Sequence, residues 1–151
     1  MKEVILFDLD QTLIDSSQVE QYRKNRNWKK VMMSLDLVKS VSGTDILLTT
    51  LKDNGFRIGL VTSSPKHYAI AICDRFNWLF DVVVAYHDTV NHKPHPEPLQ
   101  KAIQILQANA KQCIYVGDHT NDALAAQRAG IEFIRTSVDN PIRYDTLGLQ
   151  K

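Results

Sequence analysis

The 151-residue sequence predicts a three-layer α/β fold, with a central parallel sheet of about five strands and helices on both faces. Short apolar runs alternate along the chain with amphipathic segments of helical period. Most of the runs are continuously apolar, which is typical of parallel strands covered on both faces. The length is that of one domain, so we expect residues 1–151 to form a single unit.

Five apolar runs are expected to form the strands. Each is far shorter than the roughly 20 apolar residues that span a bilayer, so no membrane association is expected. The runs are Val4–Phe7, Arg57–Val61, Val82–Ala85, Cys113–Val116 and Ile131–Ile134.

Two helices are expected in the first half of the chain. One has Ile46, Leu47 and Leu51 on its apolar face and stops at Asn54-Gly55, a typical helix end. The next begins at Pro65, behind a capping Ser64, and runs toward Phe76.

Two more helices are expected in the second half. Pro96 opens the first of them. Thr120 or Asn121 is expected to cap an alanine-rich helix that ends at Gly130.

Two segments fall outside the alternation. From Leu13 to about Ser42 no strand is expected, and residues 15–42 are interpreted as a small helical insertion. Its stretch Tyr22–Lys30 has five basic and two aromatic side chains and no acid. This stretch is expected to be a solvated helix face; the alternative is a rim that steers anions or grips a nucleotide or nucleic-acid end. Residues 136–151 are expected to form a loosely packed tail.

Composition excludes several classes of protein. The net charge of +1 excludes a nucleic-acid binder driven by whole-molecule charge, though not a local basic patch. Two cysteines make neither a disulfide framework nor a four-thiolate zinc site, and they fit a reducing compartment. No secretory signal is expected at the N-terminus, so a cytoplasmic location is predicted.

Polar side chains follow four of the runs. The carboxyl ends of parallel strands meet at one edge of a sheet, where ligands bind. Four carboxylates gathered there would raise one another's pKa, so a hard divalent cation such as Mg²⁺ is expected to offset them, helped by a lysine. A cation, a lysine and hydroxyls together favour a phosphoryl ligand. The side chains are Asp8 and Asp10 after the first run, Thr62, Ser63 and Ser64 after the second, Lys93 beyond the third, and Asp118 and Asp122 after the fourth.

The order of these motifs resembles the haloacid dehalogenase (HAD) superfamily over about residues 3–134, which implies a Rossmann-like fold. The motifs are D-x-D-x-T, a strand ending in threonine, Lys-Pro, and G-D-x-x-x-D. The sequences of the segments Asp8–Ser16 and Lys93–Pro98 are similar to those of the phosphoglycolate phosphatase and β-phosphoglucomutase branch. Gln11 stands where that branch usually has glycine, which we interpret as a change in loop conformation or substrate contact. The branch carries a large cap, so the short insertion here implies a vestigial cap and an open site.

The resemblance implies a role for each residue near the phosphoryl group. Asp8 would be the nucleophile that forms an aspartyl-phosphate. Asp10 would protonate the leaving group and then activate water. Thr62 and the backbone N–H of Ser63 would bind phosphoryl oxygens, and Thr12 would hold the turn and the phosphate.

The resemblance also implies a metal site and a counter-charge. Lys93 would neutralise the phosphate and Asp8. Mg²⁺ would be held by the Asp8 carboxylate, the Asp10 carbonyl and Asp118. Asp122 would orient metal-bound water or Lys93 without binding the metal itself.

The predicted function is therefore a Mg²⁺-dependent phosphate monoester hydrolase that acts on a small phosphorylated metabolite or nucleotide. One alternative is a phosphatase for a phosphorylated macromolecule such as a nucleic-acid end, which is less favoured. Another is a non-catalytic regulatory or interaction module on the same fold, against which the complete motif set argues. A homo-oligomer would supply a wall that the short cap lacks.

Overall fold

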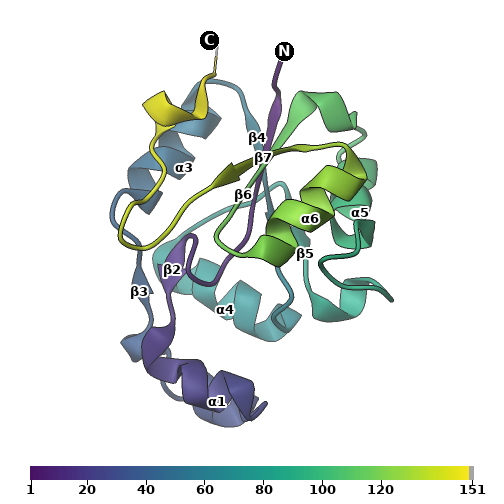
Figure 1. Ribbon diagram of the computed structural model, residues 1–151. Coiled ribbons are helices and arrows are strands. Elements are labelled where there is room, and N and C mark those ends of the chain that lie inside the picture. Colours follow the sequence, from purple (N-terminus) through teal and green to yellow (C-terminus); the bar gives the residue numbers. More distant parts are fainter. Residues whose placement is uncertain (150–151) are drawn as a thin grey trace.

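The computed structural model describes residues 1–149 and confirms the predicted α/β fold. Its centre is a parallel sheet with the strand order β5-β4-β1-β6-β7 (Figure 1). β1 lies between β4 and β6, and both of these strands come from much later in the sequence. This order brings the motifs at the ends of the three strands together. The strands are β1 (Val4–Phe7), β4 (Arg57–Val61), β5 (Val82–Val84), β6 (Cys113–Gly117) and β7 (Glu132–Arg135).

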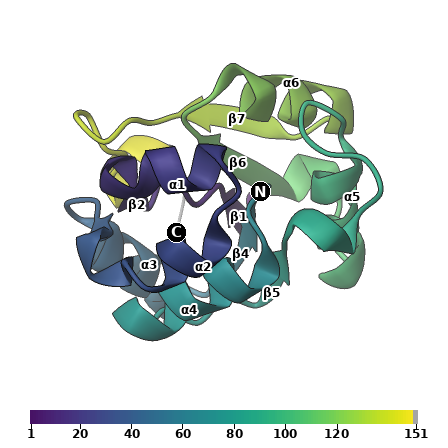
Figure 2. The same cartoon turned by 90° about the horizontal axis from the view of Figure 1, so that it is seen from below.

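Helices cover both faces of the sheet (Figures 1 and 2). Ile5 and Phe7 of β1 pack in the core with α3 and α4, whereas Val4 and Leu6 pack in a second core with α5 and α6. Alternate residues of a strand point to opposite faces, so one apolar run supplies both cores. No helix within residues 1–149 is long and apolar enough to cross a membrane. The helices are α3 (Thr44–Asp53), α4 (Lys66–Phe76), α5 (Glu97–Ile105) and α6 (Thr120–Ala129).

The two helices of the first half differ in detail from the predictions. Ile46 is 68% exposed, so its placement on the apolar face was wrong. Leu47 and Leu51, which were predicted to share that face, are buried as expected, whereas Ile46 lies off this stripe. Ser64 is not the cap of α4: Pro65 occupies that position, and the Ser64 hydroxyl donates to Asp10.

The helix starts of the second half are defined by other residues. Pro96 precedes α5, as predicted. Neither Thr120 nor Asn121 caps α6; the Nδ1 atom of His119 accepts from the backbone N–H of Asn121 at 2.9 Å. Histidine is an uncommon cap, so composition did not reveal it. Gly130 ends α6 with φ 73°, as expected for a left-handed C-terminal cap.

The insertion between β1 and α3 contains two α-helices of five residues each, and in Figure 1 it projects beyond the carboxyl edge of the sheet. Its ends pair as a two-stranded antiparallel ribbon, so the expectation of no strand was wrong. Strands of two residues are too short to show a period in the sequence. The elements are β2 (Ile14–Asp15), η1 (Ser17–Val19), α1 (Glu20–Lys24), α2 (Trp28–Met32), η2 (Leu35–Leu37) and β3 (Lys39–Ser40).

The described part of the tail is packed rather than loose. It ends in a 3₁₀ turn, η5 (Tyr144–Leu147), that lies beside α3 (Figure 1). Leu147 is buried in the core of that face, and Thr136 accepts a hydrogen bond from the backbone of Ile142. One well-placed leucine is enough to dock such a segment, although it makes no periodic pattern. Residues 150 and 151 of the predicted tail lie outside the described residues.

Candidate active site

The register of the sheet aligns the ends of the central strands. Phe7 of β1 pairs with Leu60 on one side and Val116 on the other. The backbone N–H of Asp8 then donates to the Val116 carbonyl at 2.9 Å. The strand ends open onto a pocket of about 400 Å³. Seven of the eight predicted site residues line it: Asp8, Asp10, Thr62, Ser63, Lys93, Asp118 and Asp122.

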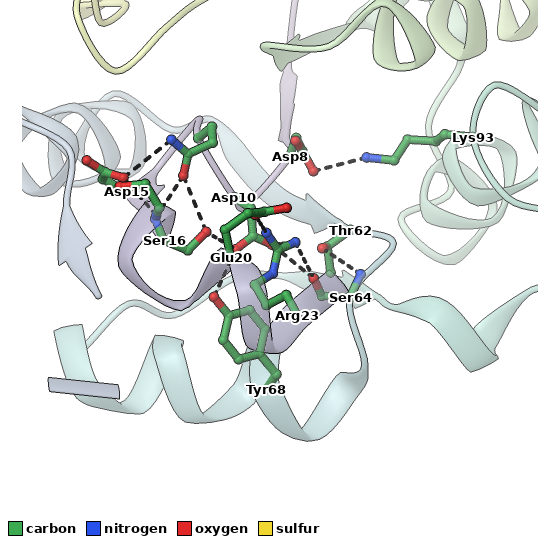
Figure 3. A network of polar contacts seen from close by, with 12 residues as sticks. Asp8, Asp10, Asp15, Ser16, Glu20, Arg23, Thr62, Ser64, Tyr68 and Lys93 are labelled. Atoms are coloured by element: carbon green, nitrogen blue, oxygen red, sulfur yellow. Dashed lines mark hydrogen bonds and ion pairs between the residues drawn. The ribbon is translucent and has the colours of Figure 1, made fainter. Parts of the chain in front are cut away.

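Lys93 lies at the centre of the polar contacts in this pocket. Its Nζ donates to Asp8 at 3.0 Å (Figure 3), to Asp122 at 2.7 Å and to the Tyr115 hydroxyl at 2.9 Å. The Lys93 side chain is 6% exposed. Burial alone lowers its pKa, but the charges of Asp8 and Asp122 outweigh that and raise the pKa well above its usual value. Lys93 is therefore a permanent buried cation.

Three carboxylates form a group in this pocket, and two of them, Asp8 and Asp122, pair with the lysine. Asp8, Asp118 and Asp122 each present an oxygen within 4.8 Å of the others. Burial raises the pKa of Asp8 to about 8, opposed by Lys93 and reinforced by Asp122. Burial and Asp122 also raise the pKa of Asp118. One lysine does not neutralise three carboxylates, and hard oxygen donors suit Mg²⁺, so this group fits a divalent cation.

Asp122 is fixed from two sides. One of its oxygens binds Lys93, and the other accepts from the backbone N–H of His119 at 3.2 Å. A Cβ at Gly117 would lie 2.6 Å from an Asp122 oxygen, so only glycine leaves room for this carboxylate. The role of Gly117 was missed, although its place directly before Asp118 was a usable signal.

The Asp10 carboxylate lies outside the three-carboxylate group, and four donors hold it (Figure 3). The hydroxyls of Ser16, Ser64 and Tyr68 donate to it at 2.8, 2.9 and 2.8 Å. Arg23 of α1 forms an ion pair with it at 3.1 Å. These four partners were missed, because they come from three separate segments and carry no common spacing. Whether the Asp10 carbonyl serves as a metal ligand stays a prediction.

Gln11 adopts φ 61°, in the left-handed region that favours glycine. The loop therefore keeps a backbone suited to the glycine that usually stands there. The Gln11 side chain compensates: its Oε1 accepts from the Ser16 backbone N–H at 2.8 Å, and its Nε2 donates to Asp15 at 3.3 Å. Gln11 also lines the pocket, so a contact with substrate remains a prediction.

The hydroxyl residues are placed unequally. Thr62 is buried and its Oγ1 accepts from the backbone N–H of Ser64 at 3.1 Å, while Ser63 is exposed in the pocket. Thr12 is buried and is not among the lining residues, which argues against the predicted phosphate contact. Its hydroxyl finds no hydrogen-bond partner within residues 1–149.

A comparison with protein families gives one match that covers most of the chain. A family model described as haloacid dehalogenase-like hydrolase matches residues 16–136. Curated relatives include the pyrophosphatase PpaX of Bacillus cereus, 34% identical over 120 residues, which are 78% of this chain and 55% of that protein. PpaX of Halalkalibacterium halodurans is 37% identical over 98 residues, 64% of this chain and 46% of the relative. The chain thus spans about half the length of the curated relatives it matches.

Solved structures show the same fold. A haloacid dehalogenase-like hydrolase from Bacteroides fragilis superposes with a TM-score of 0.78 at 24% identity, covering 91% of this chain and 89% of that one. CbbY from Rhodobacter sphaeroides, crystallised with phosphate, gives a TM-score of 0.77 at 18% identity, covering 91% and 87%. At these identities the superpositions establish the architecture and leave the substrate open.

Proposed function

Because the chain belongs to the haloacid dehalogenase-like hydrolases, we propose that it hydrolyses phosphate monoesters through an aspartyl-phosphate on Asp8. The observation that carries the proposal is the Asp8 carboxylate, held 3.0 Å from Lys93 Nζ beside two further carboxylates. The proposed substrate is a small phosphorylated metabolite or nucleotide, since the two curated relatives described above are named pyrophosphatases.

In the first half-reaction an Asp8 oxygen attacks phosphorus, and the bond from phosphorus to the leaving oxygen breaks. Lys93 holds Asp8 in place and offsets the negative charge that gathers around it. Thr62 and Ser63 follow β4 and line the pocket, and they would bind phosphoryl oxygens. Asp10 donates the proton that the leaving oxygen needs.

In the second half-reaction Asp10 takes a proton from water, which attacks the phosphorus of the aspartyl-phosphate and regenerates Asp8. For either step the Asp10 carboxylate has to exchange some of its present donors for the substrate or water. Tyr68 and Ser64 hold it within reach of the pocket, and Arg23 connects it to the insertion.

Mg²⁺ is the cofactor we propose for this site. Asp8 and Asp118 would hold it, with the Asp10 carbonyl, and Asp122 would orient Lys93 beside it. When bound, it supplies positive charge that offsets the carboxylates and the phosphoryl oxygens. Burial raises the pKa of Asp8 and of Asp118, so a bound cation would stabilise the charged form of both carboxylates, which supports this donor set.

Phosphate release from p-nitrophenyl phosphate tests the proposal. We expect release with Mg²⁺, loss with EDTA, and loss in Asp8→Asn. Asp36→Asn is the matched control, because Asp36 is exposed on the insertion and its substitution makes the same charge change outside the pocket. A ³²P-labelled substrate quenched in acid should label the protein, but not Asp8→Asn. Activity that survives EDTA or Asp8→Asn would refute the mechanism.

The same assay separates an enzyme from a non-catalytic module on this fold, for which no substrate would release phosphate. Cytoplasmic location and assembly into a homo-oligomer remain predictions.

A further inference from the structure

A second pocket of about 550 Å³ adjoins the catalytic one. The two share Arg23, Lys24, Trp28 and Ser63 as lining residues, so they form one continuous depression. Its outer wall comes from the start of α4 and the turn after β5, beside the insertion helices (Figure 2). A phosphoryl group at Asp8 would therefore lie in the same depression as the second pocket.

The second pocket is strongly cationic. Four basic side chains line it. Within residues 1–149, no aspartate or glutamate lines this pocket. Arg23 and Lys66 are paired with Asp10 and Asp88. Lys24 and Arg26 make no side-chain hydrogen bond or ion pair within residues 1–149. Two positive charges on the wall of this pocket are thus uncompensated, and they favour an anionic ligand there.

Aromatic rings alternate with these cations. Trp28 is half-buried, lines both pockets, and packs against Tyr68 with ring centroids 5.4 Å apart. Tyr86 lines the far wall, is 38% exposed, and stacks on His92 at 4.0 Å. A surface on which aromatic rings and cations alternate is suited to nucleotides, because the rings stack on bases and the cations pair with phosphates. A base presents a larger flat face to such rings than a sugar does, so the pocket favours a nucleotide over a sugar phosphate.

We propose that the second pocket binds the leaving group of the substrate, and that this group is a nucleotide: a nucleoside that carries at least one phosphate besides the one removed. The proposal rests on the phosphatase function proposed above, because it places the scissile phosphate at Asp8. The same chemistry occurs in a free nucleoside bisphosphate and at the end of a single-stranded oligonucleotide.

Four small substrates separate the two recognition elements. Adenosine 3′,5′-bisphosphate has the ring and the second phosphate, adenosine 5′-monophosphate has only the ring, glucose 1,6-bisphosphate has only the second phosphate, and glycerol phosphate has neither. We expect kcat/KM to be about tenfold higher for the adenosine bisphosphate than for adenosine 5′-monophosphate or glucose 1,6-bisphosphate. One stacked base or one charged hydrogen bond contributes about this factor. Equal or higher kcat/KM for glucose 1,6-bisphosphate would overturn the proposal.

Paired variants place the effect in the second pocket. Arg26→Gln and Trp28→Leu should each lower the preference for adenosine bisphosphate over glycerol phosphate by about tenfold. Lys29→Gln is the matched control, because Lys29 is exposed on α2 next to Trp28 and lines neither pocket. Its substitution changes the net charge by the same amount as Arg26→Gln. The control should leave the preference unchanged. An equal loss in Lys29→Gln would mean general charge attraction and would overturn the site.

An oligonucleotide with a terminal phosphate distinguishes the two sources of the ligand. If it is the better substrate, the salt dependence of its kcat/KM should become shallower by about 0.7 in logarithmic slope in Arg26→Gln, as expected when one contact to a single strand is lost. If the free bisphosphate is better, the pocket serves a small nucleotide. Both results support a nucleotide leaving group.

Calorimetry on Asp8→Asn with Mg²⁺ separates the two proposals. Adenosine bisphosphate should bind this variant, and Arg26→Gln in the same background should weaken binding about tenfold. If adenosine bisphosphate binds in this way but the wild type releases no phosphate, the proposed nucleotide site stands and the phosphatase function is refuted. Hydrolysis of glycerol phosphate without nucleotide binding would refute the site and leave the phosphatase function standing.

Discussion

Lys93→Met is expected to destabilise the protein by about 3–5 kcal/mol when no divalent cation is present, because removing one partner from buried ionic contacts leaves uncompensated charge. Lys93 Nζ lies 3.0 Å from Asp8 and 2.7 Å from Asp122, and the side chains of all three are at most 12% exposed. Methionine keeps most of the volume of lysine, so a cavity adds little to the loss.

The magnitude follows from the contacts. Each hydrogen bond to a charged group contributes about 1.5–3 kcal/mol, so the two bonds to carboxylates give about 3–6 kcal/mol. The carboxylates recover part of this by taking up protons, because burial already raises the pKa of Asp8 to about 8. Domains of this size unfold with about 5–15 kcal/mol, so the variant should still fold in mild conditions.

Urea unfolding in EDTA measures the loss directly. The double variant Lys93→Met/Asp122→Asn removes the lysine together with one of the charges it compensates, so its loss should be smaller than the sum of the single losses by at least about 1 kcal/mol. Lys29→Met is the control on an exposed lysine and should stay within about 0.5 kcal/mol of wild type. Additive losses, or a loss below about 1 kcal/mol for Lys93→Met, would refute the assignment of Lys93 as the shared buried cation.

Three further outcomes are expected. Burial raises the pKa of Asp8 to about 8, from about 3.9 in the unfolded chain, so the stability in EDTA should fall as the pH rises from about 4 to about 8. Mg²⁺ should therefore raise Tm more near pH 8 than near pH 5.5. An equal rise in Tm at both pH values, measured by calorimetry, would contradict this. Gln11→Gly should leave unfolding free energy almost unchanged, since relief at φ 61° offsets the lost hydrogen bonds, whereas Gln11→Ala should cost about 1–2 kcal/mol in urea. Gly117→Ala should cost about 1–3 kcal/mol and lower kcat, because its Cβ would displace Asp122; wild-type kcat would show that the carboxylate needs no such space.

The positions of the motifs could be predicted because they depend only on strand ends. Apolar runs located the five strands, and parallel pairing then put every residue that follows a run at one edge of the sheet. Asp8 and Asp118 are 110 positions apart in the sequence, yet their approach needed no side-chain detail, since β1 and β6 pair in register. Backbone topology thus accounts for the carboxylate group and for Lys93 beside it.

Side-chain contacts between non-neighbouring segments could not be predicted. The Asp10 carboxylate is held by Tyr68 from α4 and Arg23 from α1, and neither contact is implied by a motif or a period. His119 as the cap of α6 and Leu147 as the anchor of the tail are of the same kind. In each case a single side chain reaches a partner that only the folded chain provides, so a local pattern carries no trace of it.

The basic stretch Tyr22–Lys30 shows how folding divides one pattern into several functions. Its five basic side chains all have the same sign of charge, but α1 ends after Lys24 and the backbone turns at Arg26, whose φ is 55°. Arg23 pairs with Asp10 from within α1, Arg26 lines the second pocket, and Lys29, beyond the turn, lines neither pocket. A uniformly solvated helix face would have left the Asp10 carboxylate without its ion pair. The short insertion therefore contributes directly to the catalytic pocket, even though its helices have only five residues each.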